Sequence, residues 1–212
     1  MGCGGTPTPG WTNFDNSLTI PLSKHPLLWK TLFHAGLLHE SAKIYAQSIR
    51  DRNLQLVWIR NAARRIPLPD GSTSVVYSSH MLEHLDRAEA RCFLSEAFRV
   101  LERGGVLRIA VPDLLRRARR YLEETKDADS FVASTRLAAD KPHGLAASLK
   151  FLLVGPRHHH WMYDAASLVR LIESVGFHDA AEAPPGSTRI VDPGELNLRE
   201  REEESIYLEA LR

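Results

Sequence analysis

The chain has 212 residues, 43% of them hydrophobic, and a formal net charge of +1. This length supports a single hydrophobic core, and the near-zero charge provides no general attraction to nucleic acid or to an anionic membrane. The two cysteines, Cys3 and Cys92, argue against a disulfide framework, and we expect Cys92 to be a buried thiol within a helix. No apolar run approaches membrane-spanning length and no signal-peptide pattern is present, which indicates a soluble, cytoplasmic protein.

The chain begins with a glycine-rich segment, M-G-C-G-G-T. This segment fits the N-myristoylation pattern M-G-x-x-x-[ST], and Cys3 within it could carry a second acyl chain. It also fits a glycine-rich nucleotide-binding loop, in which glycines let the backbone approach a cofactor. The following G-W-x-N-x-D, which ends at Asp15, and the motifs further along the chain favour the loop over the lipid signal.

Residues 17–60 contain no glycine-rich segment and are predicted to contain extra helical structure. Apolar residues from Leu27 to Leu38 indicate one short helix, Ser41 to Arg52 indicates a second, and Leu54 to Ile59 reads as a strand. The helical element either covers a bound cofactor or contacts a second substrate, or it is a packed layer with no direct role.

Residues 74–114 form the most informative pattern in the chain, a strand, a helix and a second strand. Val75–Tyr77 is a short β-branched and aromatic run bounded by turn-forming residues. Asp86, with Glu89 three residues later, begins a helix in the manner of a capping box. We expect Gly104-Gly105 to end this helix. The apolar face of the helix is defined by residues at helical spacing: Ala90, Phe93, Leu94, Ala97, Phe98 and Leu101.

The second strand, Val106 to Val111, is almost continuously apolar, as expected for a parallel strand that is buried on both faces, and Pro112 ends it. The three elements together predict a right-handed β–α–β unit. Sheets of this kind bind ligands beyond the carboxyl ends of their strands. The residues at those ends are therefore candidate site residues: Ser78, Ser79, His80, Pro112 and Asp113.

An arginine-rich segment and a histidine-rich segment follow. The predicted helix Leu114–Glu124 has four arginines on one face, which we interpret as a solvated face because acidic residues follow and no aromatic residues alternate with them. The motif R-H-H-H-W-M-Y-D, residues 157–164, contains three consecutive histidines. Adjacent residues rarely direct their rings at one ion, so we expect no metal site. Asp164 is expected to cap a helix that Gly176 ends.

The C-terminal part is predicted to contain two strands. Phe177 to Ala183 is the first, with Phe177 in the core, and S-I-Y-L-E-A-L at residues 205–211 alternates in the manner of a half-buried strand. The acidic run Glu200–Glu204 between them is expected to be solvated.

Taken together, these motifs resemble those of class I S-adenosylmethionine-dependent methyltransferases. The resemblance extends from Gly2 to Ala210 and is strongest in four segments: Gly2–Asp15, Ile66–Leu85, Glu96–Leu114 and His160–Phe177. It implies a Rossmann-like, three-layer α/β/α sandwich with a mostly parallel sheet and an antiparallel last strand. It also implies one domain over residues 1–212 with a helical insertion at about residues 17–53. In the family a strand leads into the glycine loop, so we expect that the natural chain starts upstream of Met1 or that this form is truncated.

The resemblance implies S-adenosylmethionine as the cofactor. Asp15 would hold the ribose hydroxyls. Asn61 would stand where the family has an acidic residue that contacts the adenine amine, and an amide oxygen can also accept that hydrogen bond. The residues expected to contact the cofactor are Gly2, Cys3, Gly4, Asp15, Asn61, Ala62, Ser78, Ser79 and His80.

The segment H-x-W-x-Y-D precedes the last helix in these methyltransferases, close to the acceptor pocket. The resemblance therefore implies that Trp161 and Tyr163, together with Asp113, contact the acceptor, although the two aromatic residues could equally be core residues.

Histidine is the most natural general base near neutral pH. His80 is the first candidate, because it follows the strand whose end faces the methyl group in the resembling family, and His159 and His160 are the next. Alternatively, His80 and His84 orient the loop or cap the helix that follows.

The implied reaction is transfer of a methyl group to an oxygen or nitrogen of a small-molecule or glycan acceptor. The chain is most similar to small bacterial methyltransferases of the kind found in polysaccharide and cell-envelope pathways. A catalytically degenerate, cofactor-binding scaffold is the alternative, favoured by the missing first strand and by Asn61. A nucleotide-binding oxidoreductase is less well supported, because Gly2–Gly5 lacks the third glycine of G-x-G-x-x-G. We expect no nucleic-acid partner and no stable membrane insertion.

Overall fold

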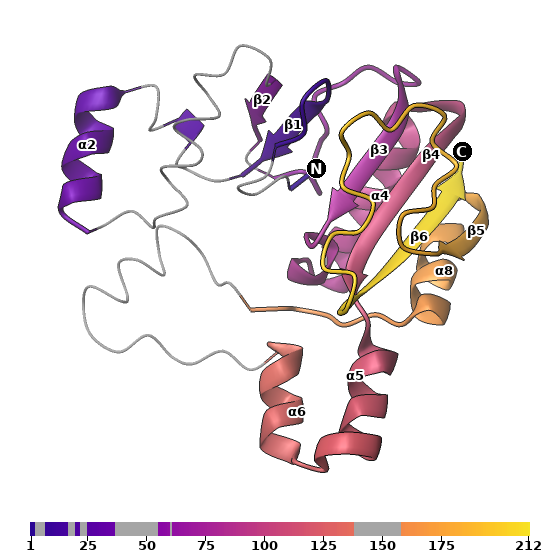
Figure 1. Cartoon of the computed structure of the whole chain (residues 1–212). Helices are drawn as coiled ribbons and strands as arrows, with labels where there is room; N and C mark the ends of the chain where they lie inside the picture. Colours follow the sequence, from indigo (N-terminus) through magenta and orange to yellow (C-terminus); the bar gives the residue numbers. More distant parts are fainter. Residues whose placement is uncertain (3–6, 17–19, 22–24, 37–54, 60, 138–157) are drawn as a thin grey trace. The chain divides into compact units, whose positions relative to one another are not determined.

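The strands in the described part of the chain form two β-sheets, one in each of two compact units (Figure 1). The computed structural model describes residues 1–2, 7–16, 20–21, 25–36, 55–59, 61–137 and 158–212. Unit 1 comprises residues 1–60, 140–156 and 194–196, and unit 2 comprises residues 61–139, 157–193 and 197–212.

Unit 1 contains a parallel pair of short strands, β1 (Thr12–Asp15) and β2 (Gln55–Trp58). The backbone extends this pairing, because the Gly2 N–H donates to the Phe14 carbonyl at 2.8 Å and the Ile59 N–H donates to the Asp15 carbonyl at 2.9 Å. The helix expected near Leu27 is confirmed as α2 (Pro26–His34). The strand expected within Leu54–Ile59 is confirmed as β2, whereas the helix expected at Ser41–Arg52 lies outside the described residues.

Unit 2 contains the predicted β–α–β unit, formed by β3 (Thr73–Ser79), α4 (Arg87–Val100) and β4 (Leu101–Pro112). Strands β3 and β4 are parallel neighbours. The capping box is present, because the Asp86 carboxylate accepts from the Glu89 N–H at 2.8 Å and the Glu89 carboxylate accepts from the Asp86 N–H at 3.3 Å. A mixed α/β fold is therefore confirmed for this part of the chain.

The predicted helix stop at Gly104-Gly105 is wrong. Helix α4 ends at Val100, and both glycines lie within β4, where the register against β3 shifts between Leu101 and Val106. Gly104 takes a left-handed backbone (φ +76), and a Cβ atom on Gly105 would lie 2.9 Å from the Glu102 carbonyl oxygen. The glycines therefore allow an irregular, closely packed stretch of strand, which is their other common use.

Three further elements complete the sheet of unit 2: α8 (Ala165–Glu173), β5 (His178–Ala183) and β6 (Ser205–Leu211). The strand order is β3-β4-β6-β5, and β6 runs antiparallel to both of its neighbours. The antiparallel last strand is thus confirmed. Its predicted half-burial is wrong, because both Tyr207 and Glu209, which alternate with the apolar residues, are also buried.

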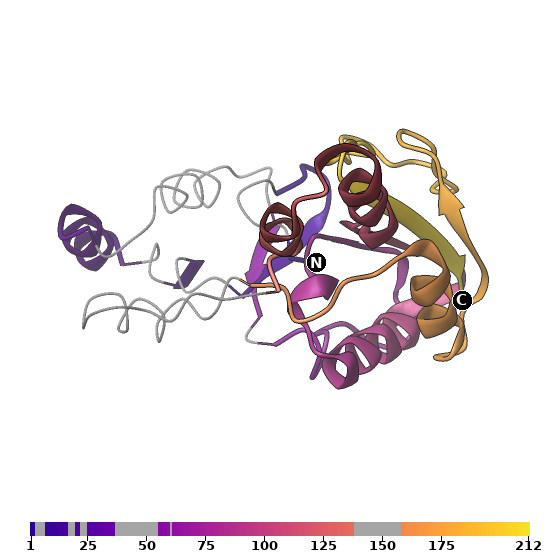
Figure 2. The ribbon, with the colours of Figure 1, turned by 90° about the horizontal axis from the view of Figure 1, so that it is seen from below.

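Helices α4 and α8 lie on the same side of this sheet (Figure 2). Asp164 caps α8 as expected, since its carboxylate accepts from the Ser167 N–H at 2.7 Å. Phe177 is buried, also as expected, and its ring meets that of Phe98 edge-on. The core between helices and sheet consists of fully buried aliphatic and aromatic side chains: Phe93, Leu94, Leu107, Ile109, Leu168, Ile172 and Leu208.

Residues 184–193 and 197–204, between β5 and β6, lie over the sheet of unit 2 (Figure 1). Arg108 and Glu209 hold this segment, because Arg108 donates to the Ser187 carbonyl at 2.8 Å and Glu209 accepts from the Arg189 N–H at 2.8 Å. This cover explains why β6 is buried on both faces. Glu200 also binds the sheet through Ser79, so the expectation that the acidic run is solvated is wrong for this residue.

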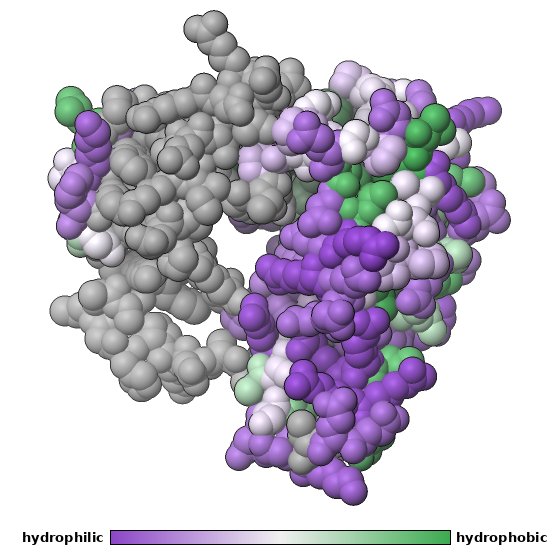
Figure 3. Space-filling view, viewed as in Figure 1, coloured by the Kyte–Doolittle hydropathy of each residue, from purple (hydrophilic) through white to green (hydrophobic). Residues whose placement is uncertain are grey.

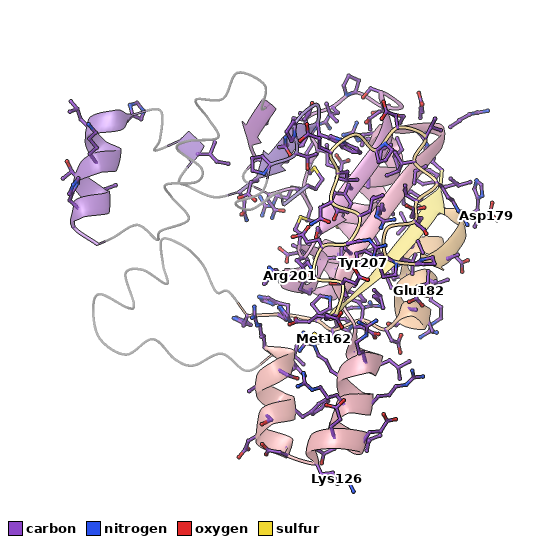
Figure 4. The ribbon with its side chains drawn as sticks, in the orientation of Figure 1. Lys126, Met162, Asp179, Glu182, Arg201 and Tyr207 are labelled. Atoms are coloured by element: carbon purple, nitrogen blue, oxygen red, sulfur yellow. The ribbon has the colours of Figure 1, made fainter. Side chains whose placement is uncertain are left out.

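A helical pair follows β4 and consists of α5 (Leu114–Arg120), the π-helical turn η2 (Tyr121–Thr125) and α6 (Ala128–Thr135). Lys126, in a left-handed conformation, turns the chain between η2 and α6 (Figure 4). The face of this pair seen in Figure 3 is mainly hydrophilic, and two of its arginines pair with acidic residues: Arg117 with Glu204, and Arg120 with Glu124.

Cys92 is exposed on α4, so its predicted burial is wrong: the residue lies on the solvent side of a helix whose other side meets the sheet. Among the helices that the structure describes, none combines the length and the apolar character needed to cross a lipid bilayer.

Candidate active site

His80 directly follows β3 and is held at the carboxyl ends of the two parallel strands. Its N–H donates to the Ala110 carbonyl at 2.9 Å, so the turn after β3 is fixed to the end of β4. Its backbone is left-handed (φ +48), a conformation that costs a non-glycine residue about 1 kcal/mol or more. The conformation places the imidazole between the short 3-10 helix η1 (Leu82–His84) and the first residue of β6.

The ring of His80 bonds to a carboxylate on one side and to a hydroxyl on the other. Nδ1 lies 3.2 Å from Glu83 Oε1, and Nε2 lies 3.0 Å from Ser205 Oγ, while the side chain is only 6% exposed. A carboxylate oxygen accepts, so in the neutral ring Nδ1 carries the hydrogen and Nε2 has the lone pair, which accepts from the Ser205 hydroxyl. This arrangement of carboxylate, imidazole and hydroxyl can take up a proton at Nε2.

Neither partner of His80 was identified from the sequence. Glu83 could have been found, because H-M-L-E-H places a carboxylate three residues after the histidine. Ser205 follows His80 by 125 residues and carries no local signal.

The hydroxyl side chains at the end of β3 have different environments. Ser79 donates to Glu200 Oε2 at 2.7 Å. Ser78 is buried, and its Oγ has no hydrogen-bond partner among the described residues. Tyr77 also meets Glu200, at 3.4 Å, and burial raises the pKa of Tyr77 to about 12. The unpaired hydroxyl of Ser78 is therefore available to a ligand.

The residues expected to bind the cofactor belong to both units. In unit 1, Gly2 uses its N–H to bond β1, Asp15 is buried at the carboxyl end of that strand, and Cys3 and Gly4 lie outside the described residues. In unit 2, Asn61 and Ala62 begin a turn in which Asn61 Oδ1 accepts from the Ala63 N–H at 2.8 Å, and Ser78, Ser79 and His80 follow as described above. Within unit 1, the Asp15 carboxylate at a strand end is a group that suits ribose hydroxyls. Within unit 2, the Asn61 amide and the Ser78 hydroxyl are groups that can hydrogen-bond a nucleoside.

The aromatic residues of the H-x-W-x-Y-D segment differ in exposure. Trp161 is 44% exposed, whereas Tyr163 is fully buried and its hydroxyl has no hydrogen-bond partner among the described residues. The Arg87 guanidinium carbon lies 5.1 Å from the centre of the Trp161 ring and 5.9 Å from that of Tyr163. Burial raises the pKa of Tyr163, and the nearby Arg87 opposes this shift. Trp161 is therefore the more accessible of the two to an acceptor.

Asp113 connects β4 to the helix that follows. Its carboxylate accepts from the Leu115 N–H at 2.9 Å as the cap of α5, and its backbone forms an isolated parallel bridge with Tyr163. These contacts place the end of β4 beside the H-x-W-x-Y-D segment.

The three consecutive histidines face different surroundings. His159 is only 3% exposed, and burial lowers its pKa to about 4, so the ring is a weak base near neutral pH. His160 is exposed, and its ring stacks on that of His158 with centres 4.7 Å apart. Among the described residues, His80 is thus the one of the three predicted general bases whose ring is oriented by a hydrogen bond to a carboxylate.

Comparison with known proteins relates part of the chain to methyltransferases. Residues 25–109 match the family model described as a methyltransferase domain, a match that begins ten residues after Asp15 and ends within β4. A stretch of 80 residues is 38% identical to a probable S-adenosylmethionine-dependent methyltransferase of Mycolicibacterium smegmatis. That stretch is 37% of this chain and 26% of the relative, so the chain spans about a quarter of the length of the curated relative that it matches.

Part of the chain is therefore similar to S-adenosylmethionine-dependent methyltransferases. Among solved structures, a methyltransferase of Methanosarcina mazei is 17% identical, with a TM-score of 0.46 over 83% of this chain and 79% of that chain. A Thermotoga maritima protein described as a possible histamine N-methyltransferase is 15% identical, with a TM-score of 0.44 over 81% of this chain and 69% of that chain. These are distant likenesses.

Proposed function

We propose that this protein transfers the methyl group of S-adenosylmethionine to an oxygen or nitrogen of a small-molecule or glycan acceptor in the cytoplasm. The observation that carries the proposal is the position of His80 at the carboxyl ends of β3 and β4, with Glu83 at one ring nitrogen and Ser205 at the other. The match of residues 25–109 to a methyltransferase domain supports the reaction class.

The cofactor, when bound, supplies a methyl group on a positively charged sulfur, which is already reactive toward a nucleophile. The residues that would hold it are the glycine-rich segment with Gly2, Cys3 and Gly4, the Asp15 carboxylate at the ribose, and Asn61 with Ala62 at the adenine. Ser78 would contribute its unpaired hydroxyl. The chain's own task is then to orient the two reactants and to exclude water.

His80 would accept the proton that an acceptor hydroxyl releases. Glu83 keeps the hydrogen on Nδ1 and so keeps the lone pair on Nε2. The Ser205 hydroxyl donates a hydrogen bond to that lone pair, so two routes for the proton are open. Either the acceptor hydroxyl replaces the serine hydroxyl at Nε2, or the acceptor passes its proton through Ser205 Oγ to His80. Trp161, being half exposed, would contact the acceptor, and Tyr163 and Asp113 would fix the segment that carries it.

A specific observation also favours the second candidate, a cofactor-binding scaffold without turnover. Asn61 replaces the acidic residue of the resembling family, and its oxygen already accepts a backbone hydrogen bond from Ala63. Adenine binding would then depend on the second lone pair of that oxygen.

Two measurements separate the candidates. Calorimetric titration of the full chain with S-adenosylmethionine and with S-adenosylhomocysteine tests cofactor binding. Transfer of a radiolabelled methyl group to a panel of cell-envelope glycan precursors and small hydroxyl or amine compounds tests turnover. Binding with transfer supports the enzyme, binding without transfer to any acceptor supports the scaffold, and absence of binding to both compounds contradicts both proposals.

A further inference from the structure

The 3-10 helix η1 and the histidine-rich loop that precedes α8 are held side by side in unit 2. The Glu83 carbonyl accepts from the N–H groups of His160 at 2.7 Å and Trp161 at 3.1 Å. The His84 ring bonds in turn to the His158 carbonyl, with Nδ1 at 3.0 Å. These contacts bring together the side chains of Glu83, His84 and His159, which offer one ligand atom each within 4.8 Å of one another.

Glu83 is a buried carboxylate with only one oxygen in use. The residue is 1% exposed, Oε1 faces His80, and Oε2 has no hydrogen-bond partner among the described residues. Burying a carboxylate without full compensation is costly, and a cation is one of the few groups that offset this cost.

The two histidines present ring nitrogens that suit a metal ion. Because His84 Nδ1 faces a carbonyl oxygen, which only accepts, Nδ1 carries the hydrogen and the lone pair lies on Nε2. Such a bond from the second nitrogen to a backbone carbonyl is the usual support of a metal-bound histidine. His159 is buried, and its Nδ1 has no hydrogen-bond partner among the described residues. The two rings meet edge-on, with centres 5.1 Å apart.

We propose that Glu83, His84 and His159 bind a divalent transition-metal ion, with Zn²⁺ as the best-suited ion. Two imidazoles and one carboxylate are zinc ligands, whereas Mg²⁺ and Ca²⁺ prefer oxygen ligands alone. With bonds of about 2.0–2.2 Å, tetrahedral ligand atoms lie about 3.4 Å apart, so separations within the cluster need to shorten by up to about 1.4 Å. Three protein ligands leave a fourth position for water.

The proposed site is not formed by the three consecutive histidines, which the sequence pattern disfavours as joint ligands of one ion. Three adjacent histidines cannot all direct their rings at one ion, and the structure uses only the middle one. The other two ligands come from η1, which lies more than 70 residues earlier in the chain and meets the loop through the hydrogen bonds described above. The half-buried His158 and the exposed His160 stack on each other and are not part of the cluster.

The test uses the untagged full chain, freed of metal with a chelator and titrated with Zn²⁺ in the absence of cofactor and acceptor. Calorimetry and metal content after dialysis should give one bound ion per chain. Binding of Co²⁺ should produce the strong visible absorption of tetrahedral coordination. Loss of a residue that only hydrogen-bonds to a metal ligand weakens metal affinity about 10- to 100-fold. Loss of a ligand itself, in His84→Ala or His159→Ala, should therefore weaken Zn²⁺ binding by at least about 100-fold.

The matched control is the double variant His158→Ala/His160→Ala, which removes the other two histidines of the same loop and should bind Zn²⁺ as the parent does. Glu83→Gln, which keeps the size and a hydrogen-bonding oxygen, should weaken binding in a chain whose circular dichroism is unchanged. The proposal is overturned if no ion remains bound after dialysis, which is the result expected if the cluster holds a buried water instead. It is also overturned if the double variant, rather than His159→Ala, abolishes binding. Because no methyl transfer is measured, failure of this proposal is distinct from failure of the proposed function.

Discussion

Arg108 and Glu209 face each other across the β4–β6 pair, and both side chains are fully buried. A guanidinium nitrogen lies 2.6 Å from Glu209 Oε1. The pair also bonds to the segment over the sheet, through the Ser187 carbonyl and the Arg189 N–H, whereas Arg108 Nε has no hydrogen-bond partner among the described residues. The pair therefore joins the centre of the sheet to its cover.

We expect Glu209→Ala to lower the free energy of unfolding by about 3–5 kcal/mol, because the guanidinium of Arg108 would remain buried without its charge partner. Urea denaturation measures this loss. The double variant Arg108→Met/Glu209→Leu should lose clearly less, since it leaves no unpaired charge. An equal loss in both variants would show that the ion pair is not the cause. Hydrogen exchange should also rise around Ser187, Arg189 and Leu198 in Glu209→Ala, because the pair bonds these residues directly.

A second prediction concerns Asp164, the cap of α8. Hydrogen bonds from the Ser167 N–H and hydroxyl hold the pKa of this carboxyl below its usual range. We expect Asp164→Ala to cost about 0.5–2 kcal/mol of unfolding free energy at neutral pH. Because the folded-state pKa is lowered, this contribution is present above the ordinary pKa of an aspartate and is lost as the pH falls through the lowered folded value.

The difference in unfolding free energy between the parent and Asp164→Ala should therefore shrink on acidification. Asp164→Ser provides the control, because serine also caps helices and does not titrate. It should retain most of the stability at neutral pH and show no change of its own in the acidic range. A constant difference between parent and Asp164→Ala down to strongly acidic pH would contradict the assignment.

The third prediction follows from the proposed function and concerns His80. We expect His80→Ala to reduce turnover by about 10²- to 10⁴-fold, the range of a general base, with the dissociation constant of S-adenosylmethionine changed by less than about twofold. Radiolabel transfer and calorimetry measure the two quantities. Ser205→Ala distinguishes the two routes for the proton: turnover falls if the proton passes through Ser205 Oγ, and is retained if the acceptor replaces that hydroxyl. Unchanged turnover in His80→Ala would remove this residue from the mechanism.

A fourth prediction compares the two adjacent glycines of β4. A Cβ atom on Gly105 would lie 2.9 Å from the Glu102 carbonyl oxygen and 3.1 Å from that of Ser74, both of them backbone atoms. We expect Gly105→Ala to destabilise the chain by about 1–3 kcal/mol through overpacking. Gly104 has open space around its Cα atom but a φ of +76, which asparagine tolerates better than other residues.

Gly104→Asn should therefore cost less than Gly105→Ala when the two midpoints of thermal unfolding are compared. The reverse order would show that backbone conformation, rather than space, limits this stretch of β4.

Local patterns predicted much of unit 2. The capping box at Asp86, the helical spacing from Ala90 and the apolar run to Val111 each depend on residues close in sequence, and all three are confirmed. The predicted glycine stop failed because the glycine pair serves the packing of β4 on β3, which is a relation between distant residues.

The partners of the candidate site could be predicted only in part for the same reason. His80 and Glu83 are three residues apart, whereas Ser205 and Glu200 reach β3 from more than 120 residues away. Burial of Glu209 depends on its ion pair with Arg108 in the neighbouring strand. The alternation of polar and apolar residues in β6 cannot indicate that another segment of the chain will bury the polar ones. The roles of Trp161, Tyr163 and Asp113 toward an acceptor stay predictions, since the contacts described for them are contacts within the protein.

The position of β6 has a consequence for how the chain folds. This strand follows β4 and β5 in sequence but lies between them in the sheet. Within the described residues, β5 has no other strand partner, so it cannot join the sheet before β6 has paired with β4. Assembly of unit 2 must therefore wait for contacts between residues about 100 positions apart, and such non-local pairing slows folding. The β3–α4–β4 unit, whose contacts are more local, can form first.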